Sequence, residues 1–315
     1  MTGSKTIRWS IAVPQRFLAE PVDIGAVREF ITRAETLRYD SLWVIEPTPS
    51  QTHGLDPLSL LSYMAALTTR VGIGVTVLNA PLHNPIRLAS TFASLDVMSK
   101  GRLTVGVGLG TASKEEVNFL PLGTMLNRRV RRFTECVEIM KALWTEPSVT
   151  YHGEFWRLDE VTIAPQPLQT PYPPIWFGGR HPNVLKRAAL HADGWTGSST
   201  NTLAFKKDVE LLKRHLDEVG RDHSSFTINQ KIFVLVYNDK RAGQLKVNDW
   251  FLNVINRGGE ESQRGVLLGT AEEVIKHLVE QKELGADIIT VNVVLGVRES
   301  IEQMELLAKE VIPFV

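Results

Sequence analysis

A pair of glycines followed by an arginine stands where a short apolar run meets a helical pattern, in the segment FGGRHP at residues 177–182. Glycine lets the backbone approach a ligand closely and adopt a positive φ, and proline suits the first turn of a helix. The free amides and the positive dipole end of such a helix suit a phosphate. The segment therefore predicts an anion site, with a plain glycine turn as the alternative. Its candidate residues are Gly178, Gly179, Arg180 and His181.

A second glycine run, GVGLG at residues 106–110, also follows an apolar stretch. It differs from a dinucleotide-binding fingerprint because its third glycine is displaced and no helix opens promptly after it. Tight packing at the end of a strand, with room for the edge of a flat cofactor, explains the run better. Gly108 and Gly110 are therefore candidates for contact with such a cofactor.

Three titratable residues are candidates for proton transfer. Glu46 ends an otherwise apolar stretch, where its carboxylate could orient a ring system, accept a proton or bind a neighbouring backbone. His53 and His83 lie in loops expected at the same end of the fold, and histidine titrates near neutral pH. The histidines and carboxylates lack metal-ligand spacing such as HExxH or HxH, so no metal site is expected.

An arginine cluster, RRVRR at residues 128–132, opens a predicted helix. A solvated helix face is the favoured interpretation of the cluster. The alternative is that its guanidinium groups bind a polyanionic tail, since clustered positive charge attracts such ligands.

Short apolar runs alternate with amphipathic helical patterns along the chain. The apolar runs are rich in valine, isoleucine and leucine and mostly do not alternate with polar residues, which is typical of parallel strands buried on both faces. Strand–helix alternation with eight such runs predicts an α/β fold, a (β/α)8 barrel of the TIM type. A doubly wound open sheet is the alternative. The expected strands are residues 7–13, 41–46, 71–78, 103–107, 175–178, 194–197, 226–237 and 287–294.

One segment interrupts this alternation. Residues 149–163 (VTYHGEFWRLDEVTI) alternate around a His-Gly pair, which predicts a β-hairpin insertion. The chain shows neither a linker nor an internal repeat, so a single domain is expected over residues 1–315. The functional site of a barrel forms at the carboxyl ends of its strands. That rule adds the end of the third strand, with Thr76, Val77 and Asn79, to the candidates.

The charge balance excludes a general nucleic-acid binder. The chain has 35 Lys and Arg and 35 Asp and Glu residues, so it lacks the basic excess that phosphate neutralisation requires. A net charge of zero gives little protection against self-association and favours an oligomer. No apolar run approaches the ~20 residues of a membrane span, and the first ten residues lack an apolar signal core. A cytoplasmic protein without membrane contact is expected.

Two longer segments carry a resemblance to a known family. Residues 70–110 read RVGIGVTVLNAPLHNPIRLASTFASLDVMSKGRLTVGVGLG and resemble the bacterial luciferase-like monooxygenases and oxidoreductases. Residues 173–195, PPIWFGGRHPNVLKRAALHADGW, look like the branch that uses the deazaflavin coenzyme F420. The hairpin LWTEPSVTYHGEFW at residues 143–156 also fits.

The resemblance implies a TIM-like barrel with insertions, usually a homodimer, whose mouth holds a ring system at the strand ends. It implies a β-bulge with a non-prolyl cis peptide bond at Thr76–Val77, which supports one face of the ring. It also implies that Gly178, Gly179 and Arg180 meet the cofactor phosphate, in agreement with the helix-start argument.

The function implied is hydride transfer between coenzyme F420 and a small organic substrate, in either direction. One alternative is a monooxygenase that uses reduced FMN and oxygen in the same pocket. Others are a non-catalytic protein that binds a flavin or deazaflavin, and a barrel enzyme for phosphorylated sugars without a redox cofactor. Specificity is expected to reside in the loops at residues 111–127 and 246–265.

Two positions depart from the family pattern. Many relatives carry an acidic residue followed by histidine at the end of the second strand, whereas here Pro47 follows Glu46 and cannot act as a base. Sugar-phosphate dehydrogenases of the deazaflavin branch carry a catalytic glutamate after the fourth strand, where this chain has Thr111. That particular activity is therefore disfavoured.

Overall fold

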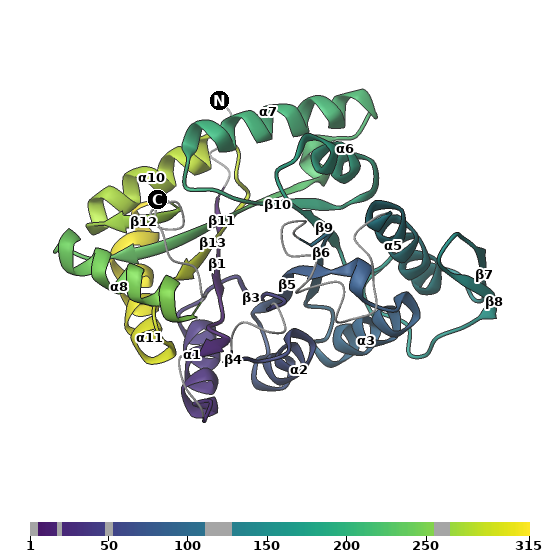
Figure 1. Ribbon diagram of the computed structural model, residues 1–315, viewed down its shortest axis with the longest axis horizontal. Helices are drawn as coiled ribbons and strands as arrows, with labels where there is room; N and C mark the ends of the chain where they lie inside the picture. Colours follow the sequence, from purple (N-terminus) through teal and green to yellow (C-terminus); the bar gives the residue numbers. More distant parts are fainter. Residues whose placement is uncertain (1–5, 18–20, 48–52, 111–127, 255–264) are drawn as a thin grey trace.

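Parallel strands form a closed barrel at the centre of the molecule (Figure 1). The computed structural model describes residues 6–17, 21–47, 53–110, 128–254 and 265–315. Each barrel strand pairs with two neighbours, and the pairing of β10 with β11 closes the ring, so the predicted (β/α)8 barrel is confirmed. The barrel strands are β1 (Arg8–Ala12), β3 (Ser41–Val44), β5 (Gly72–Asn79), β6 (Leu103–Gly108), β9 (Ile175–Gly178), β10 (Gly194–Ser198), β11 (Thr227–Val236) and β13 (Ile288–Val293).

Helices cover the outside of the barrel (Figure 1). They begin at strong local signals: Asp56 caps α2 by accepting from Ser59 N–H at 2.8 Å, and Asn84 caps α3. Their apolar faces pack on the strands in one continuous core. The helices are α1 (Ile24–Thr36), α2 (Pro57–Leu67), α3 (Pro85–Met98), α5 (Arg129–Thr145), α6 (Pro182–His191), α7 (Thr202–Glu218), α8 (Lys240–Val254), α10 (Ala271–Glu283) and α11 (Val297–Leu306).

Short elements occupy the connections between these strands and helices. β2 (Arg16–Phe17) and β4 (His53–Gly54) pair antiparallel. The 3-10 turns are η1 (Ala80–Leu82), η4 (His223–Ser225) and η6 (Ile312–Phe314), and the chain from Leu307 to Val311 (η5) is a π-helical extension of α11.

Strand β11 is longer than its barrel neighbours; it pairs with β13 along one edge and with two strands in succession along the other. Its first half, from Thr227 to Lys231, pairs with β10, and its second half, from Phe233 to Val236, pairs with a further parallel strand, β12 (Val266–Gly269). The sequence did not predict β12, because four residues after a glycine-rich, polar stretch give too short a pattern to recognise. The stretch before β12, expected to hold a helix and a loop, contains the helix α8, which runs to Val254.

The segment in which a hairpin was expected contains two antiparallel strands, β7 (Val149–His152) and β8 (Arg157–Val161). They lie outside α5, away from the barrel (Figure 1). Glu135 of α5 is fully buried, and its side chain binds the turn between the two strands. Its carboxylate accepts hydrogen bonds from the amides of Glu154 at 2.8 Å and Phe155 at 2.9 Å, and from Arg131 Nε at 2.8 Å.

We expect Glu135→Gln to destabilise the protein by about 1–3 kcal/mol, because the amide NH2 would face a buried N–H donor. Burial alone would raise the pKa of Glu135, but the hydrogen bonds from the backbone and Arg131 lower it below its usual 4.5. A carboxyl with a lowered pKa stabilises the fold above its unfolded pKa and loses this effect on acidification. The difference in urea unfolding should therefore shrink below pH 4.5. Glu146→Gln, on the exposed end of the same helix, serves as the control.

A layer of polar side chains crosses the barrel interior. Thr76 Oγ1 lies 3.3 Å from Thr196 Oγ1, which accepts a hydrogen bond from Asn229 Nδ2 at 3.2 Å. Asn229 Oδ1 in turn accepts from Thr290 Oγ1 at 2.8 Å. All four residues are buried, and their mutual pairing satisfies groups that would otherwise be costly inside an apolar barrel. The layer fixes the interior side of β5 at the position where the cavity described below begins.

Candidate functional site

A cavity of about 560 Å³ opens at the carboxyl ends of β5, β6, β9, β10 and β11. This is the end of the barrel where the sequence places the site. With the exception of Glu46, every residue predicted to bind the cofactor lines this cavity. These lining residues are Thr76, Val77, Asn79, Gly108, Gly110, Gly178, Gly179, Arg180 and His181.

One wall of the cavity is formed by an irregular segment of β5. The peptide bond Thr76–Val77 is cis and does not involve proline, as the family resemblance implied. The pairing of β5 with β6 shifts register between Val75 and Leu78, which marks a β-bulge. Thr76 is 5% exposed, and its carbonyl oxygen lies 3.5 Å from Lys231 Nζ, which donates to it.

Glycines on β6 and β9, the next two strands round the barrel from β5, close around Val77. A Cβ atom on Gly108 would lie 2.6 Å from Val77 Cγ2, and one on Gly178 would lie 2.4 Å from Val77 Cγ1. A Cβ on Gly106 would lie 2.2 Å from the carbonyl oxygen of Val75. No side chain fits at these distances, so the packing interpretation of the 106–110 run holds. Gly108, Gly178 and Val77 line the cavity together and form a smooth wall.

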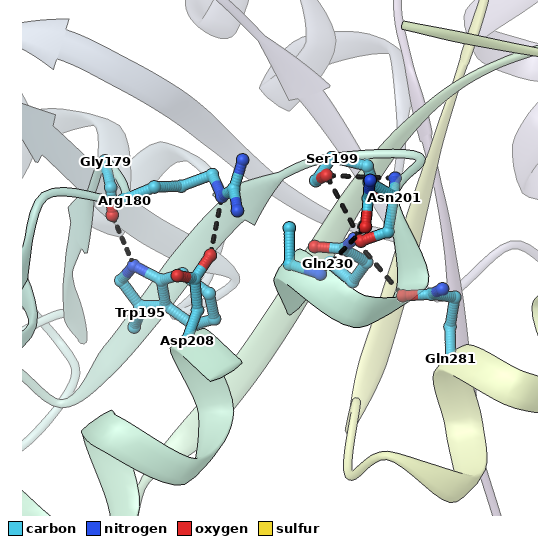
Figure 2. A network of polar contacts seen from close by, with 9 residues as sticks. Gly179, Arg180, Trp195, Ser199, Asn201, Asp208, Gln230 and Gln281 are labelled. Atoms are coloured by element: carbon cyan, nitrogen blue, oxygen red, sulfur yellow. Dashed lines mark hydrogen bonds and ion pairs between the residues drawn. The ribbon is translucent and has the colours of Figure 1, made fainter. Parts of the chain in front are cut away.

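Hydrogen bonds hold Gly179 and Arg180 in place before the start of α6 (Figure 2). Gly179 has a φ of +124°, which glycine alone adopts readily. Its carbonyl oxygen accepts from Trp195 Nε1 at 2.7 Å. Arg180 Nε donates to Asp208 Oδ2 at 2.5 Å, so one side of this guanidinium is bound by the protein itself. His181 is the N-cap of α6, where its Nδ1 accepts from the Asn183 amide at 3.2 Å.

A second network supports the loop that follows β10. Gln230 of β11 donates from Nε2 to the carbonyl oxygen of Ser199 at 2.6 Å, and its Nε2 also lies 3.3 Å from Gln281 Oε1 (Figure 2). The Ser199 hydroxyl accepts from the Asn201 amide at 3.0 Å. These bonds fix the loop beside Ser198, which lines the cavity.

Two arginines face the cavity without a counter-ion. Arg129 begins α5 and Arg187 lies on α6, and both line the cavity. Within the described part of the chain, neither forms a hydrogen bond or an ion pair, and Arg129 Nη1 is buried without a partner. Burial, together with the charge of Arg129, lowers the pKa of Arg187. Two cations that face one cavity without a carboxylate have the charge to bind an anion.

The other arginines of the 128–132 cluster bind elsewhere. Arg128 forms an ion pair with Glu154 at 2.7 Å, and Arg131 with Glu135 at 2.8 Å. Arg132 stacks over the Trp156 ring, 4.9 Å from its centroid. Only one of the four arginines thus reaches the cavity. Arg187 was not among the predicted residues, although it lies on the helix that FGGRHP opens, seven residues after Arg180.

The three candidates for proton transfer do not gather in the cavity. Glu46 Oε2 accepts from the Asn79 amide at 2.6 Å, and Glu46 Oε1 lies 2.6 Å from His83 Nε2. Neither Glu46 nor His83 lines the cavity, so Glu46 acts here as a partner for the end of β5. The backbone of His53 pairs with Phe17, and its side chain lies outside the described residues. Thr111 is also outside them.

The profile of the luciferase-like monooxygenases matches residues 9–265. The chain belongs to this family. It is 30% identical over 240 residues to the F420-dependent glucose-6-phosphate dehydrogenase of Kineococcus radiotolerans, a match that covers 74% of this chain and 70% of that protein. It is 28% identical over 264 residues to the oxygenase component of the flavin-dependent trigonelline monooxygenase of Acinetobacter baylyi, covering 74% and 72%.

Solved structures share the fold of this family member. An F420-dependent secondary alcohol dehydrogenase in complex with an F420–acetone adduct superimposes with a TM-score of 0.83 at 22% identity, covering 98% of this chain and 99% of that one. The monooxygenase RslO1 from Streptomyces bottropensis gives a TM-score of 0.83 at 23% identity, with the same coverage. At these identities the likeness supports the barrel architecture.

Two further features bear on the predicted partners. Within the described residues, no helix combines the length and the apolar character that crossing a bilayer requires. The same residues contain no group of three or more His, Cys, Asp or Glu side chains that could hold a metal ion.

Proposed function

We propose that this family member is an oxidoreductase that binds coenzyme F420 and transfers a hydride between it and a small organic substrate. The observation that carries the proposal is a single cavity that combines a smooth wall at Val77 with two uncompensated arginines, Arg129 and Arg187. A flat ring with an anionic linker has the shape and charge that these groups accept. The similarity to F420-dependent glucose-6-phosphate dehydrogenases supports the same cofactor.

The residues divide between the two parts of the cofactor. Thr76, Val77 and the flanking glycines Gly108 and Gly178 would hold the ring, because they leave the wall free of protruding side chains. Gly179 at the start of α6, together with the arginines, would hold the phosphate. When bound, F420 supplies or accepts a hydride at a ring carbon. The protein contributes binding, orientation and exclusion of water.

Reduced FMN is the second candidate for the same cavity. The similarity to a flavin-dependent trigonelline monooxygenase supports it, and that function would be a monooxygenase using oxygen. Both cofactors pair a flat ring with a phosphate, so the two arginines suit either of them.

A titration of the protein with F420 and FMN, side by side and followed by absorbance, tests the proposal. We expect F420 to bind at least about tenfold more tightly than FMN, a difference of about 1.4 kcal/mol. Tighter binding of FMN would favour the monooxygenase, and failure of both to bind would refute a cofactor site in this cavity.

The remaining expectations concern the state of the protein in the cell. A homodimer is proposed, supported by the zero net charge of the chain, and light scattering of the purified protein tests it. A single domain over residues 1–315 and a cytoplasmic location are likewise proposed. The partner expected in the cavity, besides the cofactor, is a small-molecule substrate, without nucleic acid or membrane contact.

A further inference from the structure

A second, smaller cavity lies over the other half of the barrel mouth. The 560 Å³ cavity covers the strands from β5 round to β11, whereas the smaller one, about 50 Å³, covers β11, β13, β1 and β3. Phe233 of β11 lines both cavities, so they meet at this ring. The proposed cofactor ring lies on the β5 side of the first cavity, so a second molecule bound at Phe233 would extend from the first cavity into the second.

The walls of the smaller cavity are largely apolar and aromatic. Trp43, Phe233 and Trp250 present rings to it, and the ring centroids of Phe233 and Trp250 lie 6.3 Å apart. Aliphatic side chains complete the wall, among them Val13, Pro14, Ile45 and Leu295. Flat rings and aliphatic groups of this kind favour a flat, apolar body.

A buried lysine of the larger cavity lies close to Phe233, the ring that both cavities share. Lys231 is 8% exposed, lines the larger cavity, and places its Nζ 6.0 Å from the centroid of the Phe233 ring. Its one hydrogen bond goes to the Thr76 carbonyl at 3.5 Å, and no carboxylate of the described residues lies within ion-pair distance of Nζ. Burial, and the charge of Arg16 on the rim of the smaller cavity, lower the pKa of Lys231 to about 8.

This lysine is a cation that the protein itself leaves uncompensated. A buried charge without a counter-ion is costly, and an anionic ligand would remove that cost. The ligand must reach Nζ from the cavity, since the rest of the side chain is enclosed. An anionic oxygen would replace the long bond to Thr76 with a charge-assisted one.

We infer that the half of the mouth around Phe233 binds the substrate, and that this substrate is a flat, apolar carboxylate whose anionic group pairs with Lys231. The inference rests on the proposed function, because it assigns the other half to the cofactor. It names the substrate class of the same site. Lys231 then acts as a specificity-determining residue that orients the substrate toward the cofactor ring held on the Val77 wall.

Calorimetric titration with benzoate and with benzamide, which has the same shape but no charge, tests the inference. The titrations are carried out on the purified protein before and after saturation with F420. We expect benzoate to bind at least about tenfold more tightly than benzamide. Lys231→Met should abolish this preference, and Lys231→Arg should preserve it. Lys231→Gln repeats the test with a polar, neutral side chain in case the methionine variant folds poorly.

A second variant tests whether benzoate binds at Lys231 or at the arginines proposed to hold the cofactor phosphate. Arg129→Gln with Arg187→Gln removes the other two uncompensated cations and should leave the benzoate preference unchanged. The inference is overturned if the wild type does not discriminate between the probes, if discrimination survives in the Lys231→Met and Lys231→Gln variants, or if the arginine variant loses it. Failure of the cofactor proposal would be seen separately, as absence of F420 and FMN binding, while the titrations of the cofactor-free protein still report on Lys231.

Discussion

Replacing Arg129 and Arg187 together with glutamine should weaken cofactor binding by about 100-fold, whether the cofactor is F420 or FMN. Each guanidinium faces the cavity without a counter-ion, so each is available for a charge-assisted hydrogen bond to the phosphate. Such a bond contributes roughly 1.5 kcal/mol, and about 1.4 kcal/mol corresponds to a tenfold change in affinity. Arg180→Gln should have a smaller effect, because Asp208 already occupies one of its donors at 2.5 Å.

A matched control comes from the neighbouring positions of the same helices. Arg128→Gln with Lys186→Gln removes two positive charges from exposed positions outside the cavity and should leave affinity within a factor of about three, as screened surface charges contribute little. The cofactor-free Arg129/Arg187 variant should melt at the same temperature as the wild type or higher, because mutual repulsion between two half-buried cations is relieved. Equal affinity losses in the two double variants would refute a specific anion site.

The barrel could be predicted because most of its strands and helices have recognisable residue patterns in the local sequence. Uninterrupted valine and isoleucine runs mark strands buried on both faces, and the Asp56-Pro57 and Asn84-Pro85 pairs mark helix starts. β12 was missed because its four residues gain their strand conformation from pairing with the upper half of β11. Such pairing is a tertiary property that a four-residue pattern does not encode.

The site was predicted less completely than the fold. Position at a strand end identified the glycines and the segment from Thr76 to Asn79, and the family resemblance located the cis bond. Lys231 was missed because candidates were sought at strand ends, whereas Lys231 lies in the middle of β11. It directly precedes the apolar run IFVLV. The available signal was the lysine itself, because a charged residue within a buried strand is rarely left without a partner.

The pairing of Glu46 with His83 shows a different limit of the sequence. Both side chains were correctly expected near the carboxyl ends of the strands, but proximity to the mouth does not specify direction. Glu46 turns to the Asn79 amide and to His83, both at 2.6 Å, and away from the lining of the cavity. Such a choice depends on which buried donor needs an acceptor, and the Asn79 amide has no sequence pattern of its own.

Gly178→Ala should be the most damaging single substitution in the cavity wall. Its Cβ would lie 2.4 Å from Val77 Cγ1 and 3.3 Å from Thr196 Cγ2. Val77 is β-branched, so few other rotamers could relieve the clash. The backbone around Val77, which would hold the ring, must therefore move. Overpacking of this kind costs about 1–3 kcal/mol of stability. We also expect cofactor affinity to fall by more than about tenfold, because a ring packed on this wall depends on its shape.

Removing the methyl group that causes the clash should reverse much of this loss. In Val77→Ala the Cγ1 atom is absent, so Gly178→Ala introduced into that background should cost much less than in the wild type, in both urea unfolding and cofactor titration. Residues in direct contact show coupling energies of about 0.5–3 kcal/mol in such cycles. If the two substitutions instead added independently, Gly178 would be required for its backbone conformation rather than for its closeness to Val77, and the wall would not be the surface that receives the ring.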